Sequence, residues 1–143
     1  MTAALLARID TWIFDLDNTL YPPSSRLFDL IDERMGAYIA RLLNCDTAEA
    51  RRVQKQFFHD HGTTLAGLMH HHGVEPEEFL IDVHRIELDR LAPCARLADR
   101  IAALPGRRLI FTNANADYAE RVLAARGLGG LFEDICDIRA TGY

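Results

Sequence analysis

The chain has 143 residues, of which 49% are apolar, so it can bury the core of one domain or of a small core with an insertion. Its 16 Lys and Arg residues against 21 Asp and Glu residues give a net charge of −5, which excludes the basic field that binds nucleic acid polymers non-specifically. No stretch approaches the roughly 20 apolar residues of a membrane span, and the N-terminus lacks a signal peptide's long apolar run, so we expect a cytoplasmic protein without membrane contact.

The first predicted element is a buried strand that ends in acidic residues. Residues 11–17 read Thr-Trp-Ile-Phe-Asp-Leu-Asp, and a polar segment follows before the breaker pair Pro22 and Pro23. A short apolar, β-prone run bounded by such breakers is typical of a buried strand. The carboxylates of Asp15 and Asp17 are therefore expected at the carboxyl end of this strand.

The next predicted elements, within residues 24–91, are all helices. Apolar residues recur at steps of three and four along residues 27–43, which predicts one amphipathic helix. Asp46 and Glu49 have the spacing of a capping box, so a second helix is expected to begin there, and shorter helices follow. A helical block of about 70 residues is too long for a crossover connection, so we expect a separate cap over the site.

From residue 92 onward, strands and helices alternate. Three elements are predicted in turn: a strand at 108–111, a helix at about 117–126 and a strand at 132–138. Strands that alternate with helices imply a parallel α/β sheet with right-handed connections. We therefore expect a Rossmann-like α/β core built from residues 1–23 and 92–143, with residues 24–91 inserted as an all-helical cap.

Polar residues follow the second strand as acids follow the first. Thr112 and Asn113 come directly after the apolar run of residues 108–111. In open parallel sheets, ligands bind beyond the carboxyl ends of the strands, so these residues are expected to share one site with Asp15 and Asp17.

Paired carboxylates at such a site can divide nucleophilic and acid–base work. One aspartate can attack phosphorus to form an acyl phosphate, while the other donates a proton to the leaving oxygen and later deprotonates water. Two acids facing a phosphate dianion require a hard cation, so Mg²⁺ held by Asp15 and the backbone carbonyl of Asp17 is implied. The Thr112 hydroxyl, nearby main-chain N–H groups and Asn113 would hold phosphate oxygens.

These segments resemble the haloacid dehalogenase superfamily. Residues 14–20, Phe-Asp-Leu-Asp-Asn-Thr-Leu, are similar to its motif I, DxDxT, and residues 110–113, Ile-Phe-Thr-Asn, are similar to its motif II. The resemblance implies a Mg²⁺-dependent phosphomonoester hydrolase that works through an aspartyl-phosphate intermediate. It further implies these roles: Asp15 as nucleophile and Mg²⁺ ligand, Asp17 as acid/base and carbonyl ligand, and Asn18, Thr112 and Asn113 as phosphate-binding residues.

Within that superfamily, two features narrow the expected substrate. Dehalogenases place a non-acidic residue where Asp17 stands, because a halide leaving group needs no proton, so Asp17 favours phosphate ester cleavage. Residues 17–22 and 62–68 resemble the pyrimidine 5′-nucleotidase-like branch, which implies a pyrimidine nucleoside monophosphate or another small phosphorylated metabolite. The alternative for residues 62–68 is a helix start with packing residues.

Two superfamily motifs have no counterpart in this sequence. The only lysine, Lys55, lies in the predicted cap, and the acids Asp134 and Asp137 come too early to be the motif IV pair, so edge-strand or loop positions are expected for them. We therefore expect a truncated chain that is an incomplete catalyst by itself. Such a truncation would leave the strand of residues 11–17 at an open edge of the sheet, through which two chains could form a homodimer. The rival hypothesis is a non-catalytic phosphate-binding or regulatory module.

Cysteines and histidines give no clear metal site in the sequence. The cysteines Cys45, Cys94 and Cys136 are odd in number and far apart, which is typical of free thiols in a reducing compartment. Residues 70–72 are three consecutive histidines whose side chains would point about 100° apart on a helix, so they cannot all bind one ion. Solvated or partly packed histidines are the expectation.

Overall fold

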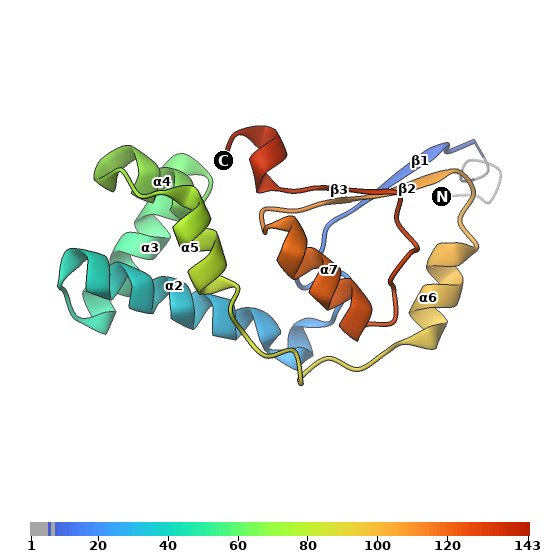
Figure 1. Ribbon diagram of the computed structural model, residues 1–143, viewed down its shortest axis with the longest axis horizontal. Coiled ribbons are helices and arrows are strands. Elements are labelled where there is room, and N and C mark those ends of the chain that lie inside the picture. Colours follow the sequence, from blue (N-terminus) through green and yellow to red (C-terminus); the bar gives the residue numbers. More distant parts are fainter. Residues whose placement is uncertain (1–5, 7) are drawn as a thin grey trace. The chain divides into compact units, whose positions relative to one another are not determined.

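The computed structural model describes residue 6 and residues 8–143, which form two compact units (Figure 1). One unit combines the N-terminal segment up to Arg26 with Leu88–Gly142 and contains the sheet. The other contains Leu27–Glu87 and is helical. Within the described part of the chain, no helix is both long enough and apolar enough to cross a membrane.

The sheet has three parallel strands in the order β1-β2-β3. These strands are β1 (Thr11–Phe14), β2 (Arg107–Phe111) and β3 (Asp134–Cys136). Phe14 is in register with Ile110, and Ile110 is in register with Ile135, so the carboxyl ends of all three strands reach the same edge. The predicted α/β fold with a parallel sheet is thus confirmed.

Two strands are shorter than the sequence predicts. The first ends at Phe14 instead of residue 17, because the Leu16 carbonyl accepts hydrogen bonds from the N–H groups of Thr19 and Leu20 at 3.2 and 2.9 Å. The chain therefore turns immediately after the strand. Leu16 in this turn is fully buried. The third strand spans only Asp134–Cys136, whereas the sequence predicts residues 132–138.

Helix α7 packs against the sheet. The helical elements of this unit among residues 8–142 are η1 (Pro23–Ser25), α6 (Ala95–Ala102), α7 (Ala116–Ala125) and η2 (Ile138–Thr141). The Asn115 side chain accepts a hydrogen bond from the Tyr118 N–H at 3.1 Å and so begins α7. One face of α7, which includes Val122 and Leu123, is buried and lies beside β3 (Figure 1).

Four helices make up the second unit. They are α2 (Leu27–Leu43), α3 (Thr47–His61), α4 (Thr64–His72) and α5 (Pro76–Val83). The prediction that Asp46 is the N-cap residue of the second helix is confirmed, because its carboxylate accepts a hydrogen bond from the Glu49 N–H at 2.8 Å. Thr63 caps α4 in the same way through the Ala66 N–H at 3.0 Å.

Close packing between α3 and α4 depends on Gly67. A Cβ atom at this position would lie 2.4 Å from Cβ and 2.5 Å from Cγ of Phe57, atoms that cannot move without shifting α3. We expect Gly67→Ala to lower the free energy of unfolding by about 1–3 kcal/mol through this overlap. Urea unfolding measures the change, with Gly129→Ala as control because no atom lies within 4 Å of its added methyl group. Equal stability of the two variants would contradict the packing role.

Candidate active site

Asp15 occupies the first position after β1 and is held by a side chain of its own loop. The Thr19 hydroxyl donates a hydrogen bond to Oδ2 of Asp15 at 2.8 Å. Asp15 remains exposed, while Leu16 anchors the same turn in the core. The turn therefore presents the Asp15 carboxylate to solvent in a restrained orientation.

Asp17 has a different environment, formed by two buried tyrosines. Its Oδ1 accepts hydrogen bonds from the Tyr21 hydroxyl at 2.6 Å and from the Tyr118 hydroxyl at 2.9 Å. The two tyrosine oxygens are 3.5 Å apart, and each residue is only 1% exposed. Tyr21 follows the loop and Tyr118 lies on α7, so the contact ties the loop to the helix.

The surroundings of Asp17 favour its protonated form. Burial raises the pKa of Asp17; the hydrogen bonds from Tyr21 and Tyr118 partly offset this effect, and the nearby charge of Asp15 adds to it. Burial, together with the Asp17 charge, also raises the pKa of both tyrosines, so they remain neutral donors. Two neighbouring carboxyl groups therefore differ: one is exposed, and one is partly buried with a raised pKa.

Two of the predicted phosphate-binding residues, Thr112 and Asn113, follow β2, and the third, Asn18, lies in the loop after β1. Thr112 is buried; its N–H donates to the Cys136 carbonyl at 3.1 Å, and its hydroxyl oxygen accepts from the Ala114 N–H at 3.1 Å. A hydroxyl that accepts in this way still carries a hydrogen that it can donate. Asn113 is exposed, and Asn18 is exposed in the left-handed conformation at φ 55°.

The register of the sheet puts these segments at one edge. Phe14 pairs with Ile110, so Asp15 and Thr112 both lie beyond the carboxyl ends of adjacent strands. The segment after β2 leads directly to the N-terminus of α7, where the helix dipole favours an anion.

Asp137 supports this edge in a way that the sequence did not indicate. It is 7% exposed, and its Oδ2 accepts hydrogen bonds from the Ala116 N–H at 3.0 Å and from Arg139 Nη1 at 2.8 Å. Its Oδ1 also accepts from the Arg139 N–H at 3.0 Å. Asp137 thus fixes the first turn of α7, whereas Asp134 is exposed in β3.

The donor set at the end of β1 is suited to a hard cation. The Asp15 carboxylate and the Asp17 backbone carbonyl are oxygen ligands, and Mg²⁺ is commonly held by one or two carboxylates plus water and phosphate oxygens. Among residues 6 and 8–143, no group of three or more His, Cys, Asp or Glu side chains is arranged around a common metal position. The residues present therefore fit a Mg²⁺ ion only if water and phosphate complete its shell.

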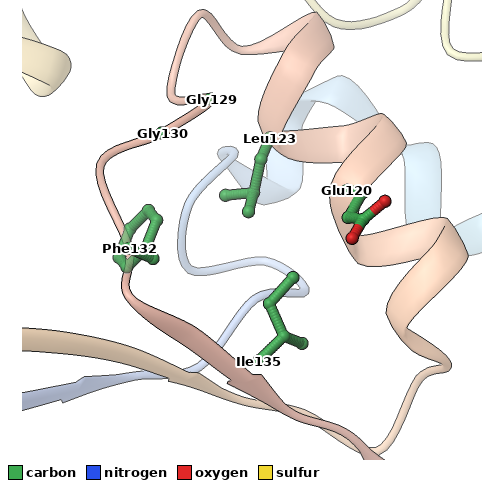
Figure 2. A pocket seen from close by; sticks show the side chains of 6 residues that line it. All are labelled: Glu120, Leu123, Gly129, Gly130, Phe132 and Ile135. Carbon is green, nitrogen blue, oxygen red and sulfur yellow. The ribbon is translucent and has the colours of Figure 1, made fainter.

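A separate pocket of about 270 Å³ lies beside α7 (Figure 2). It is lined by Glu120, Leu123, Gly129, Gly130, Phe132 and Ile135. Figure 2 shows the Glu120 carboxylate on α7 and the Ile135 side chain on β3, with Phe132 on the connecting segment. Its lining residues do not include Asp15, Asp17 or Thr112.

Comparison with known proteins shows similarity to a protein of yeast. The chain is 25% identical over 135 residues to Phosphate metabolism protein 8 of Saccharomyces cerevisiae strain S288c, an alignment that covers 87% of this chain. The chain spans 42% of the length of that relative. No model of a protein family matches the sequence. The chain is therefore similar to part of a protein named for phosphate metabolism.

Proposed function

We propose that this chain carries the nucleophile and the acid/base of a Mg²⁺-dependent phosphomonoester hydrolase of the haloacid dehalogenase superfamily. The observation that carries the proposal is the unequal environment of Asp15 and Asp17 at the end of one strand. Catalytic carboxyl pairs divide nucleophilic and acid roles when their surroundings separate their pKa values. The similarity to a phosphate metabolism protein supports the same class of chemistry.

In the first half of the proposed reaction, an Asp15 oxygen attacks phosphorus. The Thr19 hydroxyl holds Oδ2 of Asp15 and orients the carboxylate for attack. The bond from phosphorus to the ester oxygen breaks as the aspartyl bond forms, and protonated Asp17 gives its proton to the leaving alkoxide. The raised pKa of Asp17 favours the protonated form that this step requires.

In the second half, the ionised Asp17 removes a proton from water. The resulting hydroxide attacks phosphorus, the bond to Asp15 breaks, and inorganic phosphate leaves with Asp15 regenerated and Asp17 protonated again. Tyr21 and Tyr118 stabilise the transient Asp17 anion, because both hydroxyls donate to Oδ1.

Phosphate oxygens in this proposal are bound by donors near the strand ends. Thr112, Asn113 and Asn18 offer donors that add no negative charge. When bound by the Asp15 carboxylate and the Asp17 carbonyl, Mg²⁺ would neutralise the acids and the phosphate dianion.

The finer proposal is a nucleotidase acting on a pyrimidine nucleoside monophosphate or a similar small metabolite. The helical unit, Leu27–Glu87, is proposed as the cap that selects the substrate. A phosphate-release screen over nucleoside monophosphates and small sugar phosphates, with Mg²⁺ and with EDTA, tests it. Mg²⁺-dependent turnover of one class is the expected result; phosphate binding without turnover of any substrate would favour a regulatory phosphate-binding module instead.

The edge of β1 gives a prediction about assembly. Among the described residues, β1 pairs only with β2, and Ile13 is 68% exposed, so open backbone groups lie beside apolar surface. We expect the 143-residue chain to form a homodimer or larger species at high micromolar concentration, measured by light scattering. Ile13→Lys should reduce the association, because a charged edge opposes strand addition, whereas Ile81→Lys on α5, 53% exposed, should not. A monodisperse wild-type monomer of 16.1 kDa would contradict the prediction.

A further inference from the structure

Two histidines from different helices meet in the helical unit. His61 is the last residue of α3, and His71 lies in the last turn of α4. Their Nε2 atoms are 3.0 Å apart, and the two rings are nearly perpendicular at 79°. The sequence indicates only solvated or partly packed histidines in this unit and does not reveal a pair formed across two helices.

Both rings contact Phe57, and the His71 side chain is exposed. Phe57 stacks on His71 with ring centroids 5.1 Å apart and an angle of 6°, and it meets the edge of His61 at 6.0 Å. The two helices are joined only by Gly62 and Thr63, and the absent side chain at Gly67 lets Phe57 approach α4 closely. The pair is therefore built on a short, tightly packed helical hairpin.

The separation of the two nitrogens suits a shared metal ion. An ion about 2.1 Å from each of two imidazole nitrogens places them about 3.0–3.4 Å apart, for angles at the metal between about 90° and 109°. We propose that His61 and His71 form a two-histidine site for a divalent transition-metal cation such as Zn²⁺, Ni²⁺ or Cu²⁺. Imidazole is a preferred ligand of these ions, whereas Mg²⁺ prefers oxygen.

Metal binding would replace the present contact between the rings. Without metal, one Nε2 donates its hydrogen to the other; with metal, both rings are neutral, carry their hydrogen on Nδ1 and offer Nε2 lone pairs. His70 lies nearby, with ring centroids 4.7 Å from His71 and 5.4 Å from His61. Among the described residues, no three His, Cys, Asp or Glu side chains are placed to bind one ion together. In this proposal water therefore completes the coordination, and the ion is exchangeable.

The test is a calorimetric titration with Ni²⁺ in excess Mg²⁺, which keeps oxygen sites occupied. Wild type should bind one Ni²⁺ per chain, and His61→Ala and His71→Ala should each weaken binding by more than about tenfold. His59→Ala is the matched control, because His59 is 88% exposed and contacts the adjacent Asp60 instead of the pair. It should leave the affinity unchanged.

Three results would overturn the proposal. They are no Ni²⁺ binding by wild type, equal weakening by His59→Ala, and unchanged affinity after loss of His61 or His71. Circular dichroism shows whether each variant keeps its helices, and His71→Gln, which preserves a polar side chain without the imidazole, should reproduce the loss. Because metal binding is measured directly, the outcome does not depend on phosphatase activity.

Discussion

Asp15→Asn, introduced into the full-length enzyme proposed to contain this chain, should reduce kcat for phosphate release at least 10³-fold, a loss of about 4 kcal/mol of transition-state stabilisation. The amide nitrogen and oxygen that replace the carboxylate neither attack phosphorus nor neutralise a divalent cation. Asp15 is exposed, and among residues 6 and 8–143 its side chain forms a hydrogen bond only with Thr19 of its own loop, so the fold should tolerate the change. Steady-state release of inorganic phosphate in saturating Mg²⁺ measures the loss.

The control for this substitution is Asp99→Asn, an exposed acid on α6 of the same unit. It removes the same charge without touching the loop, so kcat should stay within about twofold of wild type. An Asp15→Asn protein that retains more than about a tenth of wild-type kcat would contradict the nucleophile assignment, because loss of covalent chemistry costs several kcal/mol.

Local signals in the sequence predicted the elements that frame the site. The acids after the first strand, the polar pair after the second and the helix cap at Asp46 each lie where a short pattern indicates. Such patterns are local, because strand alternation, turn residues and caps act over a few residues. The end of β1 was placed too late, since the Leu16 carbonyl closes a turn that an apolar run does not reveal.

Side-chain partners from distant segments could not be predicted in the same way. Asp17 meets Tyr118 across 101 positions, and His61 meets His71 across two helices. The available signals were weak: Tyr21 lies one helical turn after Asp17, and Tyr118 follows the cap Asn115 by three residues. Many tyrosines have such spacings, and only the packing of α7 against the loop selects this pair.

Asp17→Asn is the second substitution with a large expected effect: its turnover should fall strongly, while its substrate affinity should stay nearly unchanged. We expect kcat to fall about 10²–10⁴-fold, because the amide cannot donate a proton to the leaving oxygen or take one from water. The Asn oxygen can still accept hydrogen bonds from Tyr21 and Tyr118, so the loop should keep its geometry. Equilibrium binding of substrate should stay within a few-fold of wild type; a loss of binding as large as the loss of turnover would indicate a structural role instead.

The same substitution should also stabilise the fold, with a pH dependence that follows from the raised pKa of Asp17. In wild type, the folded state holds this proton to a higher pH than the unfolded state, whose Asp titrates near 3.8. Between these two pKa values the folded state binds more protons, so wild-type stability falls as pH rises and then levels off above the folded pKa. The neutral amide of Asp17→Asn removes this loss. Its melting temperature, compared with wild type across pH 3–8, should therefore exceed the wild-type value by an amount that grows as the pH rises above 3.8 and becomes constant above the folded pKa of Asp17. A constant difference at every pH would mean that burial does not hold the Asp17 proton in the folded protein.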